Sequence, residues 1–141
     1  MDYNDTLNSK KPKMDKKGYN INNFIDIGEV AQNFIQVYFT NISKNNIQFL
    51  INNKIIREYT TIKYNTDKMK GEQIIPFLNN FSRYNIKVNT YNYIDSGSRR
   101  IDISIIGTMT SQNETINFNQ TFIICNQDDS WYIKNSIFLT F

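Results

Sequence analysis

The fold is decided by the last quarter of the chain, Thr115-Ile-Asn-Phe-Asn-Gln-Thr-Phe-Ile-Ile-Cys-Asn-Gln-Asp-Asp-Ser-Trp-Tyr-Ile-Lys-Asn-Ser-Ile-Phe-Leu-Thr-Phe141. Two runs rich in β-branched and aromatic residues flank the polar residues 126–130, and this pattern predicts a β-hairpin. The second run continues to the last residue. Because an unpaired terminal strand would fray, we expect this strand to pair inside a larger sheet.

Two earlier segments predict further long strands. Residues 84–94 and residues 100–110 are rich in Ile, Thr and Tyr, which favour strands. Polar residues 95–98 join the two segments, and residues 111–114 predict the turn that leads into the closing hairpin. Short connections make consecutive strands neighbours, so we expect three or four long antiparallel strands in sequential order.

Helices are expected before these strands. In residues 21–44 apolar side chains recur at steps of three and four, which predicts an amphipathic helix packed on a core. Its apolar positions are Ile27, Val30, Ala31, Phe34, Ile35 and Tyr38. A short helical turn is expected at residues 47–50. A second short helix is expected at residues 71–81, where Pro76 lies early enough for its missing backbone donor to be tolerated.

The residues between the two helical regions predict one more strand. Residues 57–64 have β-branched and aromatic character, and residues 65–67 have the composition of a turn. Helices packed on one face of an antiparallel sheet form an α+β layer architecture, which is the fold class we expect.

Length and charge suggest one domain with a polar extension. A chain of 141 residues is long enough for one domain with its own core. Residues 1–20 contain five Lys and three Asp and few aliphatic side chains, so we expect a disordered Lys-rich tail followed by a domain at residues 21–141. The tail is a solubilising segment or a weak nuclear localisation signal. The remaining residues hold 11 basic and 10 acidic groups, without the basic stripe typical of nucleic-acid binding.

Several functional classes have no support in the sequence. One Cys and no His cannot form an internal disulfide or a Cys/His metal site. The N-terminus lacks the apolar region of a signal peptide, and no run approaches the roughly 20 apolar residues of a membrane span. We therefore expect a protein of the nucleus or cytoplasm that contacts no membrane and needs no cofactor.

The ionisable residues do not suggest a catalytic site. Histidine, the most useful general base near neutral pH, is absent from the chain. The carboxylates expected in strands are Glu58 and Asp102, and Tyr91 and Tyr93 could supply hydroxyl groups, but these residues form no recognisable acid–base pair. We expect no catalytic residues.

Alternation along the strands divides the sheet into two faces. One face is expected to form the core under the helices, with Trp131 and Phe138 beside it. Its residues are Ile101, Ile103, Ile105, Phe118, Phe122 and Ile124.

The opposite face combines few charges with scattered isoleucines. Its expected residues are Asp102, Ser104, Ile106, Asn119, Thr121, Ile123 and Ile137. A solvent-facing sheet usually carries more charge, whereas interfaces combine low charge with apolar anchors. We predict a partner interface formed by Ser104, Ile106, Asn119, Thr121, Ile123 and Ile137. The alternative is an ordinary exposed face in a chain with 23 Ile residues.

Short motifs resemble the nuclear transport factor 2-like family over residues 24–141. They are Phe34-Ile-Gln-Val-Tyr-Phe39, Gly71 before a helix, Phe118-Asn-Gln-Thr-Phe-Ile123, Trp131, and Asn135-Ser-Ile-Phe138. The resemblance implies a curved antiparallel sheet wrapped around N-terminal helices, with a cone-like apolar pocket. It also implies that the free sheet face packs against a second domain of this kind.

Within that family, the resemblance favours the small subunit of the general mRNA export receptor. The family's Ran-GDP import carrier has three acids where this chain has Asn65, Ser111 and Asn113, and a Trp where it has Ile27. The export subunit lacks these acids. It pairs with a similar domain of the large receptor subunit, which implies contact with nucleoporins through the complex and a location in nucleus and cytoplasm at the nuclear pore.

One departure and two alternatives accompany this interpretation. Leu139 stands where the family usually has an Arg that makes an intersubunit salt bridge, so the pairing here is apolar or the partner differs. The alternatives are a homodimeric import carrier for Ran-GDP and a small-molecule-binding or isomerase-like cone domain.

Overall fold

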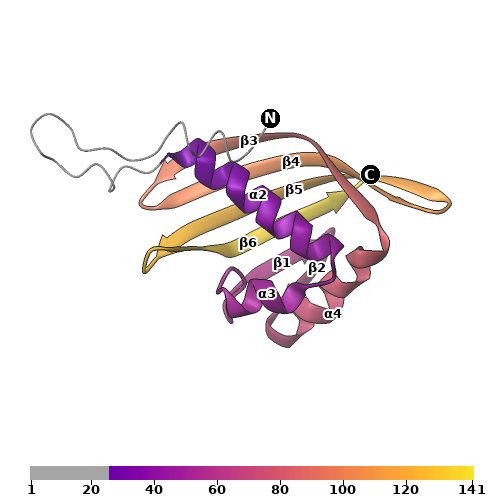
Figure 1. Cartoon of the computed structure of the whole chain (residues 1–141), viewed down its shortest axis with the longest axis horizontal. Coiled ribbons are helices and arrows are strands. Elements are labelled where there is room, and N and C mark those ends of the chain that lie inside the picture. The colour runs from indigo at the N-terminus through magenta and orange to yellow at the C-terminus, as the bar shows by residue number, and fades with distance from the viewer. Residues whose placement is uncertain (1–25) are drawn as a thin grey trace, which may run out of the picture.

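The computed structural model describes residues 26–141, which form helices packed on one curved sheet (Figure 1). The expected tail at residues 1–20 lies outside the described residues. The helical elements are α2 (Ile27–Ser43), α3 (Ile47–Asn52), η2 (Gly71–Gln73), α4 (Ile74–Asn79) and η3 (Asn80–Arg83). The strands are β1 (Thr61–Tyr64), β2 (Asp67–Lys70), β3 (Asn85–Gly97), β4 (Arg100–Ser111), β5 (Glu114–Gln127) and β6 (Ser130–Thr140). The α+β class is confirmed.

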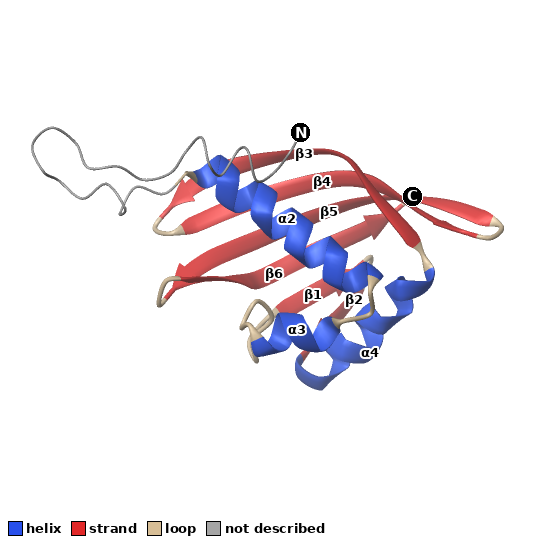
Figure 2. Ribbon diagram, viewed as in Figure 1, coloured by secondary structure: helices blue, strands red, loops and turns tan. Residues whose placement is uncertain are grey.

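The six strands form one sheet in the order β2-β1-β6-β5-β4-β3. Strands β3 to β6 are the expected sequential antiparallel meander, and the closing hairpin β5–β6 lies inside the sheet. Helix α2 crosses one face of the sheet, while α3 and α4 lie near β1 and β2 (Figure 2). No described helix packs on the opposite face, and at one end of it Arg57 and Tyr59 contact the Tyr132 ring.

The prediction for residues 57–64 was only partly right. Residues 57–60 form a turn in which the Arg57 N–H donates to the Thr60 hydroxyl at 2.9 Å, and the strand begins at Thr61. The turn expected at residues 65–67 is shorter, because Asn65 adopts a left-handed φ of 51° and lets the chain reverse within two residues. Asp67 therefore already begins β2, a strand that the sequence did not predict.

The amphipathic helix expected in residues 21–44 is α2. Asp26 caps its N-terminus, since the Asp26 carboxylate accepts a hydrogen bond from the Glu29 N–H at 3.1 Å. Its buried residues are Ala31, Phe34, Ile35, Tyr38 and Ile42. The second expected helix is also present, divided into η2, α4 and η3, with Pro76 in the first turn of α4.

The core is aromatic and lies between α2 and the helix-facing side of the sheet. The expected core residues of β4 and β5 are all buried. The Phe122 ring meets the Tyr38 ring at 4.8 Å and the Phe34 ring at 5.0 Å between centroids, both edge to face. Trp131 packs against the core and Phe138 is buried within it, as expected.

A bulge in β6 makes both of these core contacts possible. Ile124 pairs with Ile133, but Ile123 pairs with Asn135, so one residue of β6 is unmatched. Before the bulge, the core-facing residues of β6 have odd numbers, such as Ile133. After it they have even numbers, Ser136 and Phe138.

Gly107 on β4 is packed closely between the backbone of β3 and the Phe118 ring. A Cβ at this position would collide with the carbonyl oxygen of Lys87 and lie 2.7 Å from the Phe118 ring. We therefore expect Gly107→Ala to lower the free energy of unfolding by about 1–3 kcal/mol, because neither the β3 backbone nor a buried ring can move away freely. Urea unfolding of the two proteins measures the difference. A change below about 0.5 kcal/mol, typical of a surface substitution, would contradict this packing.

Candidate functional site

The sheet face that points away from the helices is called the outer face. The register sets its side chains in rows across the strands. One row contains Thr90, Ile106, Asn119 and Leu139. The next row contains Asn92, Ser104, Thr121, Ile137 and Lys63. A third row contains Ile94, Asp102, Ile123, Asn135 and Thr61.

All six residues predicted for a partner interface lie on the outer face. Large apolar side chains remain exposed there: Ile106 by 46% and Ile137 by 42%. Leu139, which the interface prediction did not include, is also 42% exposed and pairs with Asn119. Alternation alone could have found Leu139, since it lies two residues after Ile137 on the same strand.

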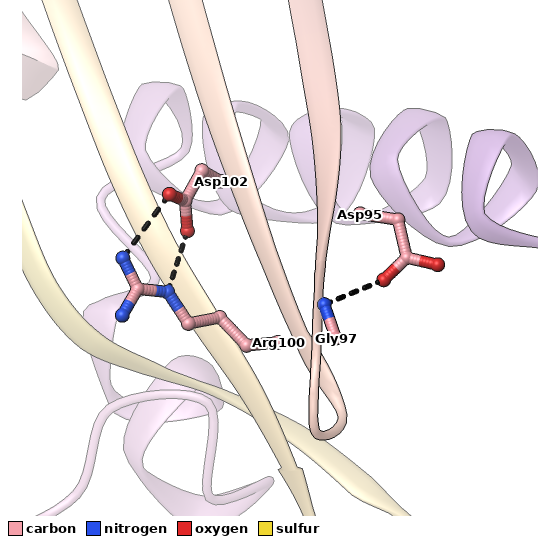
Figure 3. A network of polar contacts seen from close by, with 4 residues as sticks. All are labelled: Asp95, Gly97, Arg100 and Asp102. Atoms are coloured by element: carbon pink, nitrogen blue, oxygen red, sulfur yellow. Dashed lines mark hydrogen bonds and ion pairs between the residues drawn. The ribbon is translucent and has the colours of Figure 1, made fainter.

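The carboxylate on the outer face is neutralised within its own strand. Asp102 accepts from Arg100 through both oxygens, with Arg100 Nε at 2.8 Å and Nη2 at 3.1 Å (Figure 3). The hydrogen bond from Arg100 lowers the pKa of the Asp102 carboxyl below its usual value. In the adjoining turn, the Asp95 carboxylate accepts from the Gly97 N–H at 2.9 Å (Figure 3). The centre of the outer face, over β4 to β6, therefore combines polar and apolar side chains and carries little net charge.

The interior of the cone does not form the apolar pocket that the resemblance implied. The cavity that Tyr38, Phe81, Gln120 and Phe138 help to line measures about 10 Å³. This is room for no more than about one water molecule. Aromatic side chains from α2, α4 and the sheet fill the space around this cavity, so among the described residues this part of the interior is closely packed.

A small polar network is buried in this aromatic core. The Gln120 side-chain amide donates to the Ser136 hydroxyl at 3.0 Å, and Gln120 also bonds to the Tyr38 side chain. Burial raises the pKa of the Tyr38 hydroxyl above its ordinary value. Tyr38 is therefore neutral over the physiological range and serves as a hydrogen-bonding group in the core.

The raised pKa of Tyr38 predicts a loss of stability at alkaline pH. In the unfolded chain this tyrosine ionises near pH 10, while in the folded chain it stays protonated. The contribution of this difference to the free energy of unfolding is complete below about pH 10. Above about pH 10 it declines by up to about 1.4 kcal/mol per pH unit. In Tyr38→Phe we expect a shallower decline between about pH 10 and 11.5, measured by urea unfolding at each pH. If the free energy of unfolding fell equally steeply with pH in the two proteins, the raised pKa assigned to Tyr38 would be contradicted.

The carboxylates and hydroxyls considered for catalysis lie apart. Glu58 was expected within a strand, but it lies in the exposed turn before β1. Asp102 points to the outer face, as expected from the alternation, whereas Tyr91 and Tyr93 are on the helix-facing side of β3. Within residues 26–141, no three acidic, His or Cys side chains gather closely enough to hold a metal ion.

Of the three positions that carry acids in the Ran-GDP carrier, Asn65 has a structural role here. The Asn65 side chain accepts from the Thr140 N–H at 3.0 Å and donates to the Thr140 hydroxyl at 3.1 Å, which ties β1 to the end of β6. Ser111 ends β4 and Asn113 lies in the following turn. The neighbouring Glu114 accepts from the Tyr84 hydroxyl at 3.1 Å. Ile27 begins α2 and packs against the core.

These features define a class of α+β domains in which a curved, open and mostly antiparallel sheet carries N-terminal helices on one face. The sequence model of the nuclear transport factor 2 (NTF2) domain matches residues 30–140, and the chain belongs to this family. The family resemblance of the sequence motifs is thereby confirmed. No curated protein matches the chain.

Solved structures with the same fold are distant in sequence. An NTF2-like protein from Cytophaga hutchinsonii is 10% identical with a TM-score of 0.70, and covers 83% of this chain and 100% of its own. The yeast Ubp3-associated protein Bre5 is 18% identical with a TM-score of 0.68, covering 83% and 98%. A structure of the yeast deubiquitinase Ubp3 and Bre5 cofactor complex is 18% identical with a TM-score of 0.67, covering 82% and 97%. At these identities the likeness shows the fold alone. Within the described residues, no helix is long and apolar enough to cross a membrane.

Proposed function

We propose that this chain is a non-catalytic adaptor that pairs, through its outer face, with another domain of the same family. The proposal rests mainly on one observation. A broad sheet face displays exposed Ile106, Ile137 and Leu139 among mostly uncharged polar side chains, with Lys63 beside Ile137.

The composition of the outer face favours protein contact over simple exposure. Interface centres are depleted in charge and contain apolar anchors inside a polar surround. Here the anchors are separated by Ser104, Asn119 and Thr121, whose hydroxyl and amide groups can bond to a partner. Half-buried Ile123 lies in the next row, bordered by Asp102 and Asn135. The helix-facing side, by contrast, is already filled by the aromatic core.

The similar structures agree with a role in protein partnering. One of them contains Bre5 as a cofactor of the deubiquitinase Ubp3, so a domain of this fold works there with another protein. Because the identity is 18%, this supports partnering in general and not that particular partner for this chain.

We further propose that the partner is the large subunit of an mRNA export receptor, which would bring the chain to the nuclear pore and into contact with nucleoporins through the complex. The motif at Phe118–Ile123 supports this assignment, as do the uncharged residues Asn65, Ser111 and Asn113 at the positions of the Ran-binding acids. The Ran-GDP carrier is the weaker alternative, because Asn65 is committed to hydrogen bonds with Thr140. A small-molecule-binding or isomerase-like domain is weaker still, because the interior cavity of about 10 Å³ has no room for a substrate.

Affinity purification of the tagged full chain from its native cell, followed by co-expression with the stoichiometric partner, tests the proposal. We expect a 1:1 complex with a large protein that contains an NTF2-like domain, and poor solubility or weak self-association of the chain alone. A tight homodimer that binds Ran-GDP would overturn the export assignment.

A further inference from the structure

Three lysines gather at one edge of the outer face. Lys63 is on β1, and Lys68 and Lys70 are on β2. The buried residue Ile62 and its partner Met69 fix the opposite side of these strands to the core, so the three lysines share the outer face. All three are exposed. We call Lys63, Lys68 and Lys70 the basic edge.

The basic edge is unfavourable in the isolated domain. Lys63 and Lys68 are direct cross-strand partners, and like charges placed opposite each other destabilise a strand pair. Among residues 26–141, no carboxylate lies within ion-pair distance of these three ammonium groups. An arrangement that costs stability and has no ion-pair partner in the described domain suits an external one.

The basic edge is continuous with the candidate docking surface. Lys63 lies beside Ile137 in the register of β1 with β6, and Ile137 pairs with Thr121 on β5. A partner that covers Ile137 would therefore approach the ammonium group of Lys63. Lysines at the rim of an interface act mainly on the association rate and on the choice of partner.

The outer face carries a clear net positive charge, although the domain as a whole is nearly neutral. Its paired strand positions carry five cations, Lys63, Lys68, Lys70, Lys87 and Arg100, and one carboxylate, Asp102, for a net of +4. Lys134, the unmatched bulge residue of β6, is a further exposed lysine. Residues 21–141 contain 11 basic and 10 acidic groups, so outside the paired positions of the outer face six basic and nine acidic groups remain. The domain is nearly neutral overall, but its charges are unevenly distributed between the outer face and the rest of the surface. This distribution can be seen only from the strand register.

We infer that the basic edge selects a partner domain that presents carboxylates to it, and that it disfavours pairing with a second copy of this chain. This inference rests on the proposed docking role of the outer face. In an isologous dimer both subunits contribute the same surface, so two copies would bring two faces of +4 together. An acidic partner would relieve the Lys63–Lys68 repulsion instead of doubling it.

Nucleic acid fits the basic edge less well than an acidic protein. Proteins that hold single strands combine basic grooves with aromatic side chains on which bases stack. The outward positions of β1 and β2 are Thr61, Lys63, Lys68 and Lys70, without an aromatic residue, and their neighbours on β6 include Ile137. Ile137 can pack against an apolar side chain of a protein partner, but it cannot bind a phosphate group.

The inference is tested with four full-length proteins: the wild type, a reversal variant with Lys63→Glu, Lys68→Glu and Lys70→Glu, a control variant with Lys44→Glu and Lys54→Glu, and Ile123→Lys. Lys44 and Lys54 are exposed and lie next to α2 and α3, away from the outer face. Binding is measured to the partner that co-purifies with the wild type, at about 50 and 300 mM NaCl, where screening differs strongly.

At low salt we expect the reversal variant to associate with the partner at least about tenfold more slowly than the wild type. The association rate of the reversal variant should no longer fall as salt is raised. The control variant should stay within about twofold of the wild-type rate. We also expect the wild type alone to sediment as a monomer at low salt. If the reversal leaves rate and salt dependence unchanged while Ile123→Lys abolishes binding, the inference is overturned and the docking role stands. If neither affects binding, the proposed function fails as well. A tight low-salt homodimer, or binding of a 20-nucleotide poly-uridine RNA at about 150 mM NaCl that the reversal removes, would also overturn the inference.

Discussion

Phe122→Ala is expected to lower the free energy of unfolding by about 3–5 kcal/mol, a large part of the stability of a domain of this size. The Phe122 side chain is fully buried and is the point at which β5 meets α2. Its ring contacts those of Phe34, Tyr38 and Phe39. Truncation would remove these contacts and leave a cavity that the rigid sheet and the capped helix cannot close.

Urea unfolding followed by far-UV circular dichroism measures this loss, and Phe141→Ala provides a matched control. Phe141 is 73% exposed, so its removal should change the free energy of unfolding by less than about 0.5 kcal/mol. A loss below about 1.5 kcal/mol for Phe122→Ala would show that the core between α2 and β5 is less tightly packed than the ring geometry indicates.

Local alternation was sufficient to predict most of the sheet. Phe118 and Phe122 lie on one face because they are an even number of residues apart, and the same rule separated Ile105 from Ile106. Asparagine- and aspartate-rich turns between long apolar runs then placed the meander in order. The amphipathic period of α2 was equally clear, because its apolar residues all face one core.

What the sequence could not show depends on contacts between distant residues. Strand β1 has four residues and pairs in parallel with β6, more than 70 positions later, and no local pattern encodes that choice. Strand β2 is mostly polar because only Met69 packs inward, so it lacks the alternation of a strand. Without β2, Lys63 and Lys68 could not be recognised as neighbours, and the basic edge of the candidate site was missed.

Ile123→Lys is expected to weaken partner binding at least about 100-fold while the isolated domain stays folded. Ile123 is half-buried on the outer face, opposite Asp102 on β4, so a lysine there remains hydrated and can approach that carboxylate in the free domain. In the complex the ammonium group would lose its water beside an Asp102 carboxylate that Arg100 already engages through both oxygens, at a cost of about 3–5 kcal/mol. Such a cost corresponds to a factor of about 100 or more in Kd.

The Kd of the co-purified partner, measured by isothermal titration calorimetry for the wild type, Ile123→Lys and Ile75→Lys, tests the docking role of the outer face most directly. Ile75 is 37% exposed on α4 and lies off the sheet, so it matches the chemistry of the change without touching the outer face. The outer-face account predicts at least about 100-fold weaker binding for Ile123→Lys and less than about threefold change for Ile75→Lys. Equal affinity of Ile123→Lys and the wild type, or a loss confined to Ile75→Lys, would contradict it.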